Sequence, residues 1–251
     1  AAVERNHSLL CVGLDPDAAF FPEYFPNANL AQPKPTQQRR VRRGGPEWAP
    51  GIPAPGETVK FSDLPDDHVA VQYLYRRGFD IEEIRRLHET MALYYCTQGQ
   101  FSMAEGKGST SGRLIFPVYM SDQNPREPIL KGWQARQIER TLEETELAGV
   151  KEVWNGNHWT TFRKVGGFWE DRYVPKYYTM PGMERSNILY NFDVAKQYDT
   201  VAVAEGPLDV LRAGPQCVGT FGKAVTPRQV EMIKTHWSKA FILRDPRSEE
   251  H

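Results

Sequence analysis

The segment YDTVAVAEGPLDVLRAG (residues 198–214) carries the pattern on which the fold of this chain depends. Its apolar run at 200–204 predicts a buried β-strand, which Glu205 and Gly206 follow directly. We expect a helix over 207–213 with Asp209 in its first turn. An aspartate at that place either caps the helix or joins Glu205 in an acidic site, and the residues alone leave both roles open.

The same alternation continues downstream. We predict a strand at 217–220, a helix at 226–237 and a strand at 240–244, which Asp245 follows. Alternating strands and helices indicate a parallel sheet with helices on its faces. Because ligands gather beyond the carboxyl ends of parallel strands, Glu205 and Asp245 are expected at one edge. Two carboxylates there suit Mg²⁺ or Mn²⁺, completed by water and substrate phosphates.

The residues before this alternation predict helices followed by hairpins. The segment 64–96 has the spacing of two short helices joined at Gly78, the first capped by Asp66 or Asp67. GRLIFPVYM (112–120) and PILKGWQAR (128–136) predict the two strands of one hairpin, and an Asn-Gly turn at 155–156 predicts a second, aromatic hairpin. The expected fold class is therefore an α+β subdomain followed by an α/β unit.

Composition limits the functional classes. The 251 residues are 40% hydrophobic and 25% charged, which is typical of a globular domain, and no apolar run approaches the roughly 20 residues of a membrane helix. Three isolated cysteines favour a reducing compartment, so we expect a cytoplasmic protein without a membrane partner. A formal charge of −1 means that any nucleic-acid partner requires a local basic surface.

One such basic cluster lies in a proline-rich stretch near the N-terminus. KPTQQRRVRRGG carries Arg39, Arg40, Arg42 and Arg43, which form either a solvated tether or a clamp on nucleic-acid phosphates. We divide the chain into an N-terminal strand with a Pro/Arg-rich arm or linker, an α+β subdomain with the aromatic hairpin, and an α/β unit, at 1–56, 57–197 and 198–251.

Several motifs together resemble one known family. VAVAEGPLDVL, VGTFGKAVTPRQ and AFILRDP, in this order, resemble the TOPRIM fold of bacterial and phage DNA primases and of topoisomerases. Upstream, GRLIFPVYM and GWQAR resemble two strands of the primase catalytic core, and KYYTMPGMERSNILY resembles the stretch that leads into TOPRIM. DLPDDHVAVQYLYRRGFD is similar to a helical segment of phage primases and primase-helicases. The resemblance spans about residues 60–247.

The resemblance implies template-directed synthesis of RNA primers on single-stranded DNA from nucleoside triphosphates, in a phage-encoded case inside the bacterial host cell. It implies a DNA-directed RNA polymerase activity with Mg²⁺ or Mn²⁺, and it suggests a replicative helicase as protein partner. Glu205 and Asp245 would bind the metal and act as catalytic acids, and Asp209 would support them. Such chemistry depends on positioning and on charge neutralisation by metal and cations.

The same resemblance also indicates which basic side chains and which loop would contact the nucleic acid or the triphosphate. The side chains expected on a basic surface that binds template or triphosphate are Arg113, Arg136, Lys176 and Lys223. Gly219, Gly222 and Lys223 match the loop after the second strand of that family, where backbone amides would meet phosphate oxygens.

The chain departs from the family pattern at its last strand. Asp245 is followed by Pro246 and Arg247, so a positive charge replaces the second acid of an Asp-x-Asp pair and would repel Mg²⁺. We also expect a truncated TOPRIM unit and no zinc ribbon. Three interpretations therefore stay open: a primase of impaired activity, a non-catalytic module that binds single-stranded nucleic acid, and a nuclease- or topoisomerase-like TOPRIM fragment.

A fourth interpretation comes from the N-terminus. SLLCVGLDPD (8–17) resembles the first strand of orotidine 5′-phosphate decarboxylase, a β/α barrel, and VKFSDLP (59–65) distantly resembles the strand of that enzyme that carries a lysine. The regular eight-fold alternation of such a barrel does not follow in the sequence. The simpler expectation is a short strand that ends in an Asp-Pro turn.

Overall fold

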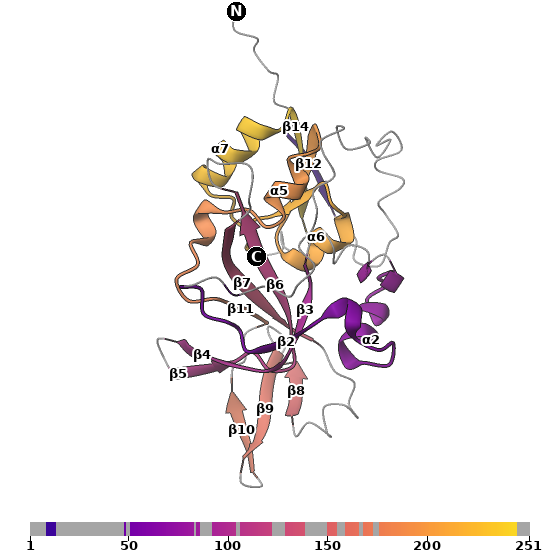
Figure 1. Ribbon diagram of the computed structural model, residues 1–251, viewed down its shortest axis with the longest axis vertical. Helices are drawn as coiled ribbons and strands as arrows, with labels where there is room; N and C mark the ends of the chain where they lie inside the picture. The colour runs from indigo at the N-terminus through magenta and orange to yellow at the C-terminus, as the bar shows by residue number, and fades with distance from the viewer. Residues whose placement is uncertain are drawn as a thin grey trace, which may run out of the picture.

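The fold combines one parallel sheet with several antiparallel ones (Figure 1). It is known from a computed structural model, which describes residues 9–13, 48, 51–82, 84–85, 92–103, 106–121, 129–138, 150–154, 159–165, 168–172 and 176–244. The mixed α/β class expected from the sequence is confirmed for these residues.

The parallel sheet has four strands in the order β1-β14-β12-β13, which span Leu9–Gly13, Lys239–Arg244, Thr200–Ala204 and Cys217–Gly219. Its helices are α5 (Phe192–Ala195), α6 (Pro207–Ala213) and α7 (Pro227–His236). The predicted alternation of strands and helices between 200 and 244 is therefore confirmed. The strands are three to six residues long and mostly apolar. The capping residue Thr226 precedes α7, and Gly214 follows α6.

Strand β12 is buried on both faces. Val201 and Val203 belong to the apolar cluster formed with α5 and α7, whereas Ala202 and Ala204 belong to the cluster that contains residues of α6. Because side chains alternate along a strand, an uninterrupted apolar run is what such a two-sided strand requires. The strand that leads to Glu205 is thus held firmly in the centre of the sheet.

Strand β1 extends the sheet from the other end of the chain. It runs parallel to β14, with Leu9 paired with Ala240 and Gly13 paired with Arg244. The sequence predicts a strand here but does not identify its neighbour. The carboxyl ends of β1, β14 and β12 consequently lie at one edge of the sheet.

The second large sheet is antiparallel, in the order β11-β7-β6-β3-β2. Its strands span Tyr177–Thr179, Ile129–Gln137, Arg113–Met120, Tyr94–Gln98 and Glu57–Lys60. The predicted hairpin of β6 and β7 is confirmed. Two helices lie between β2 and β3 in the chain: the short helix η1 (Phe61–Asp63) and α2 (Val69–Arg76). Another short helix, η2 (Arg185–Asn187), lies between β11 and α5. One apolar cluster includes Phe116 and Trp133 of the antiparallel sheet together with Leu208 and Leu211 of α6. That shared core fixes the two sheets against each other.

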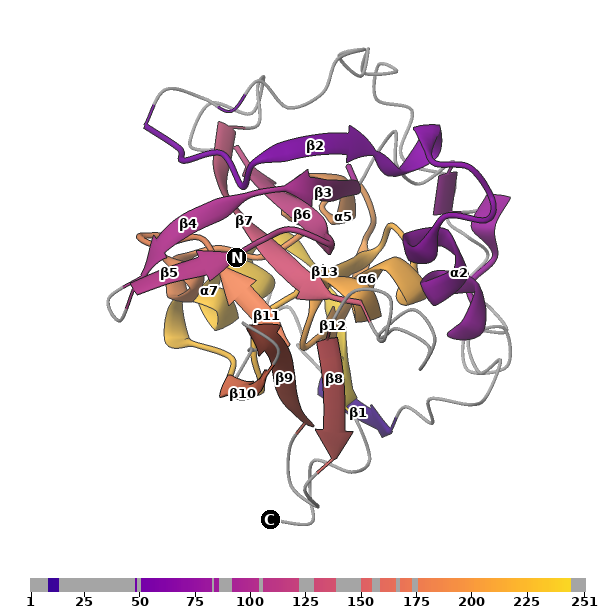
Figure 2. The same ribbon diagram turned by 90° about the horizontal axis from the view of Figure 1, so that it is seen from below.

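Two smaller sheets complete the described fold (Figure 2). Strands β4 (Gln100–Met103) and β5 (Gly106–Ser109) form a hairpin. Strands β8 (Val150–Trp154), β9 (Trp159–Val165) and β10 (Phe168–Arg172) form an antiparallel sheet, as the Asn-Gly signal predicts. Across the described ranges the strands form these separate sheets and not one closed parallel barrel, so the decarboxylase-like interpretation is not supported.

Two local expectations were wrong. The cap of α2 is His68, whose Nδ1 accepts a hydrogen bond from the N–H of Ala70, and not Asp66 or Asp67. The end of the second expected helix is instead strand β3, because Tyr94 and Cys96 bury their side chains on one face while the backbone pairs with β6. In the part of the chain that is described, no helix has both the length and the apolar character needed to span a bilayer.

Candidate functional site

The candidate site is the turn between β12 and α6. Glu205 follows β12 and is partly exposed, and Gly206 is the N-cap of α6. The N–H of Gly206 donates to Oδ2 of Asp209 at 3.0 Å, and Pro207 occupies the first helical position, where no N–H is needed. Asp209 therefore has the capping role, one of the two roles that the sequence left open.

The loop after β13 is tied to the same turn. The N–H of Thr220 donates to the carbonyl of Ala204 at 3.0 Å, and the N–H of Gly222 donates to the carbonyl of Glu205 at 3.0 Å. The N–H of Gly219 donates to the carbonyl of Tyr190 at 3.2 Å. Of the backbone amides in this region, those of Gly219 and Gly222 thus donate hydrogen bonds within the protein.

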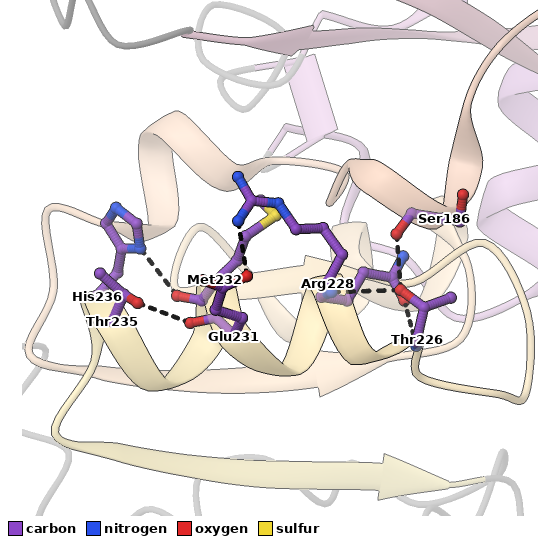
Figure 3. Close-up of polar contacts among 8 residues, drawn as sticks. Ser186, Thr226, Arg228, Glu231, Met232, Thr235 and His236 are labelled. Carbon is purple, nitrogen blue, oxygen red and sulfur yellow. Dashed lines mark hydrogen bonds and ion pairs between the residues drawn. The ribbon is translucent and has the colours of Figure 1, made fainter.

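A buried glutamine that the sequence analysis missed supports this loop. Nε2 of Gln229, on α7, donates to the carbonyls of Arg185 (3.0 Å), Ile188 (2.9 Å) and Thr220 (3.2 Å). Its Oε1 accepts from the N–H of Thr226, which caps α7 and also donates through its hydroxyl to Ser186 (Figure 3). The Thr-x-x-Gln spacing is a capping-box signal, but the three carbonyl contacts come from segments distant in sequence.

The outer side of α7 carries surface contacts. Figure 3 shows the exposed ion pair of Arg228 with Glu231 and the hydrogen bond from the Thr235 hydroxyl to the Glu231 carbonyl, at 2.7 and 2.8 Å. An exposed pair of this kind contributes little to stability. Glu231 is therefore a suitable surface residue for a control substitution.

Arg113 and Arg136 are each 3% exposed. The guanidinium of Arg136 donates to the Tyr73 hydroxyl at 3.2 and 3.3 Å and lies 4.7 Å from the ring centroid of Tyr177. That of Arg113 lies 4.2 Å from the ring centroid of Tyr178 and donates to the Lys176 carbonyl at 3.4 Å. The expectation that these two arginines lie on an open basic surface does not match their burial.

Tyr177 connects the antiparallel sheet to the candidate site. A Cβ added to Gly206 would stand 3.4 Å from the Tyr177 hydroxyl, so the phenol lies directly against the turn. Burial raises the pKa of Tyr177 to about 12, although the charge of Arg136 acts in the opposite direction. The tyrosine therefore stays protonated at neutral pH, as a neutral polar group beside the turn.

Positive charges from three elements surround the Asp209 carboxylate. Desolvation by the surrounding protein raises its pKa although the residue remains accessible to solvent. The Gly206 N–H and the charges of Arg136, Arg77 and Lys176 act to lower that pKa. These cations come from β7, the end of α2 and the start of β11, so an anionic ligand at the turn would meet positive charge on the side of the antiparallel sheet.

The expected metal ligands are only partly described. Strands β12 and β14 are parallel neighbours with Val203 paired to Ile242, and β14 ends at Arg244, one residue before Asp245. Asp245 itself lies outside the described residues, as do Arg39, Arg40, Arg42 and Arg43. Within the described ranges, no cluster of three or more Asp, Glu, His or Cys side chains suited to a metal ion occurs. Lys176 and Lys223 are both exposed.

Comparisons with known proteins yield similarity at the level of structure. No protein family matches the sequence, and no curated protein matches it. The fold is similar to the zinc-binding and RNA polymerase domains of the Aquifex aeolicus primase, with 17% identity, a TM-score of 0.45 and coverage of 70% of this chain and 43% of that chain.

It is also similar to the RNA polymerase domain of Mycobacterium tuberculosis primase DnaG, with 16% identity, a TM-score of 0.34 and coverage of 68% of this chain and 48% of that chain. A structure of that domain in complex with double-stranded DNA has 18% identity, a TM-score of 0.34 and coverage of 68% and 45%. The chain spans less than half the length of each of these solved chains.

Proposed function

We propose that this chain is the core of a DNA primase-like nucleotidyltransferase, which makes RNA primers on single-stranded DNA from nucleoside triphosphates. The observation that carries the proposal is the meeting of the two sheets at one turn. Asp209, in the first turn of α6, is under the influence of the positive charges of Arg136, Arg77 and Lys176, and Glu205 precedes the same turn. Phosphoryl transfer needs this combination, because it depends on positioning and on neutralising phosphate charge.

The oxygen ligands fit a hard divalent cation. Glu205 is partly exposed at the carboxyl edge of the sheet, and Asp245 follows the neighbouring strand. In the proposal these two carboxylates hold Mg²⁺ or Mn²⁺, which would neutralise charge on the triphosphate. Asp209 supports the turn through its bond to Gly206 and is not a ligand.

The cations take different parts in the proposal. Lys176 and Lys223 are exposed and contact the template or triphosphate. Arg136 is buried and acts indirectly, because it holds Tyr177 beside the turn. Arg113 holds the next residue of β11, Tyr178. The N-terminal arginines would add contacts to backbone phosphates, and a replicative helicase would deliver the single strand.

A second candidate is a non-catalytic module that binds single-stranded nucleic acid. The sequence feature that favours it is Arg247, which stands where a second metal-binding acid is expected. Such a module would bind DNA equally well in the presence of a chelator, whereas an enzyme of the first kind needs the metal for turnover.

A primer-synthesis assay separates the two. The purified protein is incubated with a single-stranded template, labelled ribonucleotides and Mg²⁺ or Mn²⁺, beside the variants Glu205→Gln and Glu231→Gln. The proposal predicts short RNA products that disappear in Glu205→Gln and persist in the surface control. Chelator-resistant binding without products would favour the second candidate, and products that survive Glu205→Gln would contradict the proposed site.

A further inference from the structure

The end of helix α2 presents an aromatic ring to solvent. Tyr75 is 66% exposed, whereas Tyr73 and Leu74 beside it are fully buried. Apart from Ile129, at 47%, it is the exposed large hydrophobic side chain of the described residues. The helix is therefore anchored on one side by its buried residues and presents the Tyr75 side chain on the other.

Positive charge gathers around the same helix end. Arg76 and Arg77 are exposed, and Arg212 of α6 donates to the Arg77 carbonyl at 2.6 Å. The guanidinium of Arg212 also lies 5.4 Å from the ring centroid of Phe79. Figures 1 and 2 both place α2 beside α6. Exposed arginine side chains from α2 and α6 thus make this helix end rich in positive charge, which suits an anionic partner.

The helix end is connected to the candidate site through packed side chains. The guanidinium of Arg77 lies 5.7 Å from the ring centroid of Tyr73, whose hydroxyl accepts hydrogen bonds from Arg136. Arg136 in turn lies over Tyr177, which contacts the Gly206 turn. Arg77, which is exposed, therefore lies at the outer end of a row of contacts that begins at the turn.

We propose that Tyr75, Arg76, Arg77 and Arg212 form a binding surface for single-stranded nucleic acid, on which a base stacks against Tyr75 and the arginines contact its phosphates. The inference rests on the proposed function, since it names where the template lies outside the catalytic turn. An exposed tyrosine that precedes two exposed arginines fits a single strand, because every unpaired base offers a face for stacking. In duplex DNA those faces are already stacked.

The test is binding of a fluorescent oligo(dT) by anisotropy, with EDTA present so that no metal chemistry contributes. Tyr75→Ala should weaken binding about 5- to 100-fold, and Tyr75→Phe should stay within about 2-fold of the wild type, because it keeps the ring. Arg76→Gln should reduce the slope of log affinity against log salt by about one, whereas Tyr75→Ala should leave that slope unchanged. Ile129→Ala is the matched control, since it removes the other exposed apolar side chain.

Two outcomes overturn the surface. One is oligo(dT) binding that Tyr75→Ala does not weaken beyond the Ile129→Ala control; the other is equal binding of duplex DNA that is insensitive to Tyr75. These results leave the catalytic proposal standing. Tyr75-dependent binding by a protein that makes no primers supports the surface and counts against the catalytic proposal alone.

Discussion

Replacement of Arg136 by methionine tests how the buried cation holds the candidate site. Arg136 is 3% exposed, and its guanidinium contacts the Tyr73 hydroxyl and the Tyr177 ring. A hydrogen bond from a charged donor contributes about 1.5–3 kcal/mol, and a desolvated cation–π contact about 2 kcal/mol. Methionine recovers part of this by apolar burial, since replacing buried charge by well-packed apolar groups is often tolerated. We expect a net loss of about 2–4 kcal/mol in the free energy of unfolding.

A double-mutant cycle measures how much of that loss in the free energy of unfolding comes from the hydrogen bonding between Arg136 and the Tyr73 hydroxyl. Urea unfolding followed by circular dichroism is measured for the wild type, Arg136→Met, Tyr73→Phe and the double variant. Tyr73→Phe alone should cost about 1–2 kcal/mol, and the coupling energy should be about 1–2 kcal/mol. A coupling energy indistinguishable from zero would refute the inference that the Tyr73 hydroxyl holds Arg136 in place.

Three further substitutions test other parts of the fold. Gln229→Met leaves the carbonyls of three segments without their donor and should lower the free energy of unfolding by about 2–4 kcal/mol; a loss below about 1 kcal/mol would mean that water replaces the amide. Burial lowers the pKa of His68 below 6.5, so its contribution to stability is full above pH 6.5 and declines as the pH falls below it through the folded-state pKa. The urea midpoint should therefore drop between pH 7.5 and pH 5.5 by more in the wild type than in His68→Asn, which keeps an N-cap that does not titrate; equal drops would contradict this. Gly132→Ala places a Cβ 2.7 Å from the Met183 sulfur at a φ of +155° and should destabilise more than Gly182→Ala, where φ is +81° and the space is open; the reverse order in thermal unfolding would be inconsistent with the backbone geometry.

The elements between 200 and 244 could be predicted closely because their signals are local. Uninterrupted apolar runs bounded by Gly206, Gly214 and Thr226 define strands and helix ends within a few residues. The hairpin of β6 and β7 could be predicted equally well from its two apolar segments. Strand β3 was missed because Tyr94 and Cys96 fit either a buried helix face or a strand, and only pairing with β6 decides between them.

The candidate site was harder to predict because its contacts join distant segments. The position of β1 beside β14 depends on pairing between opposite ends of the chain, for which no local signal exists. The burial of Arg113 and Arg136 depends on Tyr178 and Tyr177, which lie more than 40 residues downstream. A sequence predicts that an arginine is basic but not that an aromatic ring covers it. The position of Glu205 at the carboxyl end of β12 could be predicted because it directly follows a buried apolar run.

The most direct test of the central claim is Mn²⁺ binding measured by electron paramagnetic resonance on the wild type, Glu205→Gln, Asp245→Asn and the surface control Glu231→Gln. We predict at least about 10-fold weaker Mn²⁺ binding in Glu205→Gln and in Asp245→Asn, because each substitution removes one carboxylate ligand of a hard cation. Binding by the control Glu231→Gln should be unchanged. Equal Mn²⁺ affinity in the wild type and Glu205→Gln would contradict a metal site at the carboxyl edge of the parallel sheet.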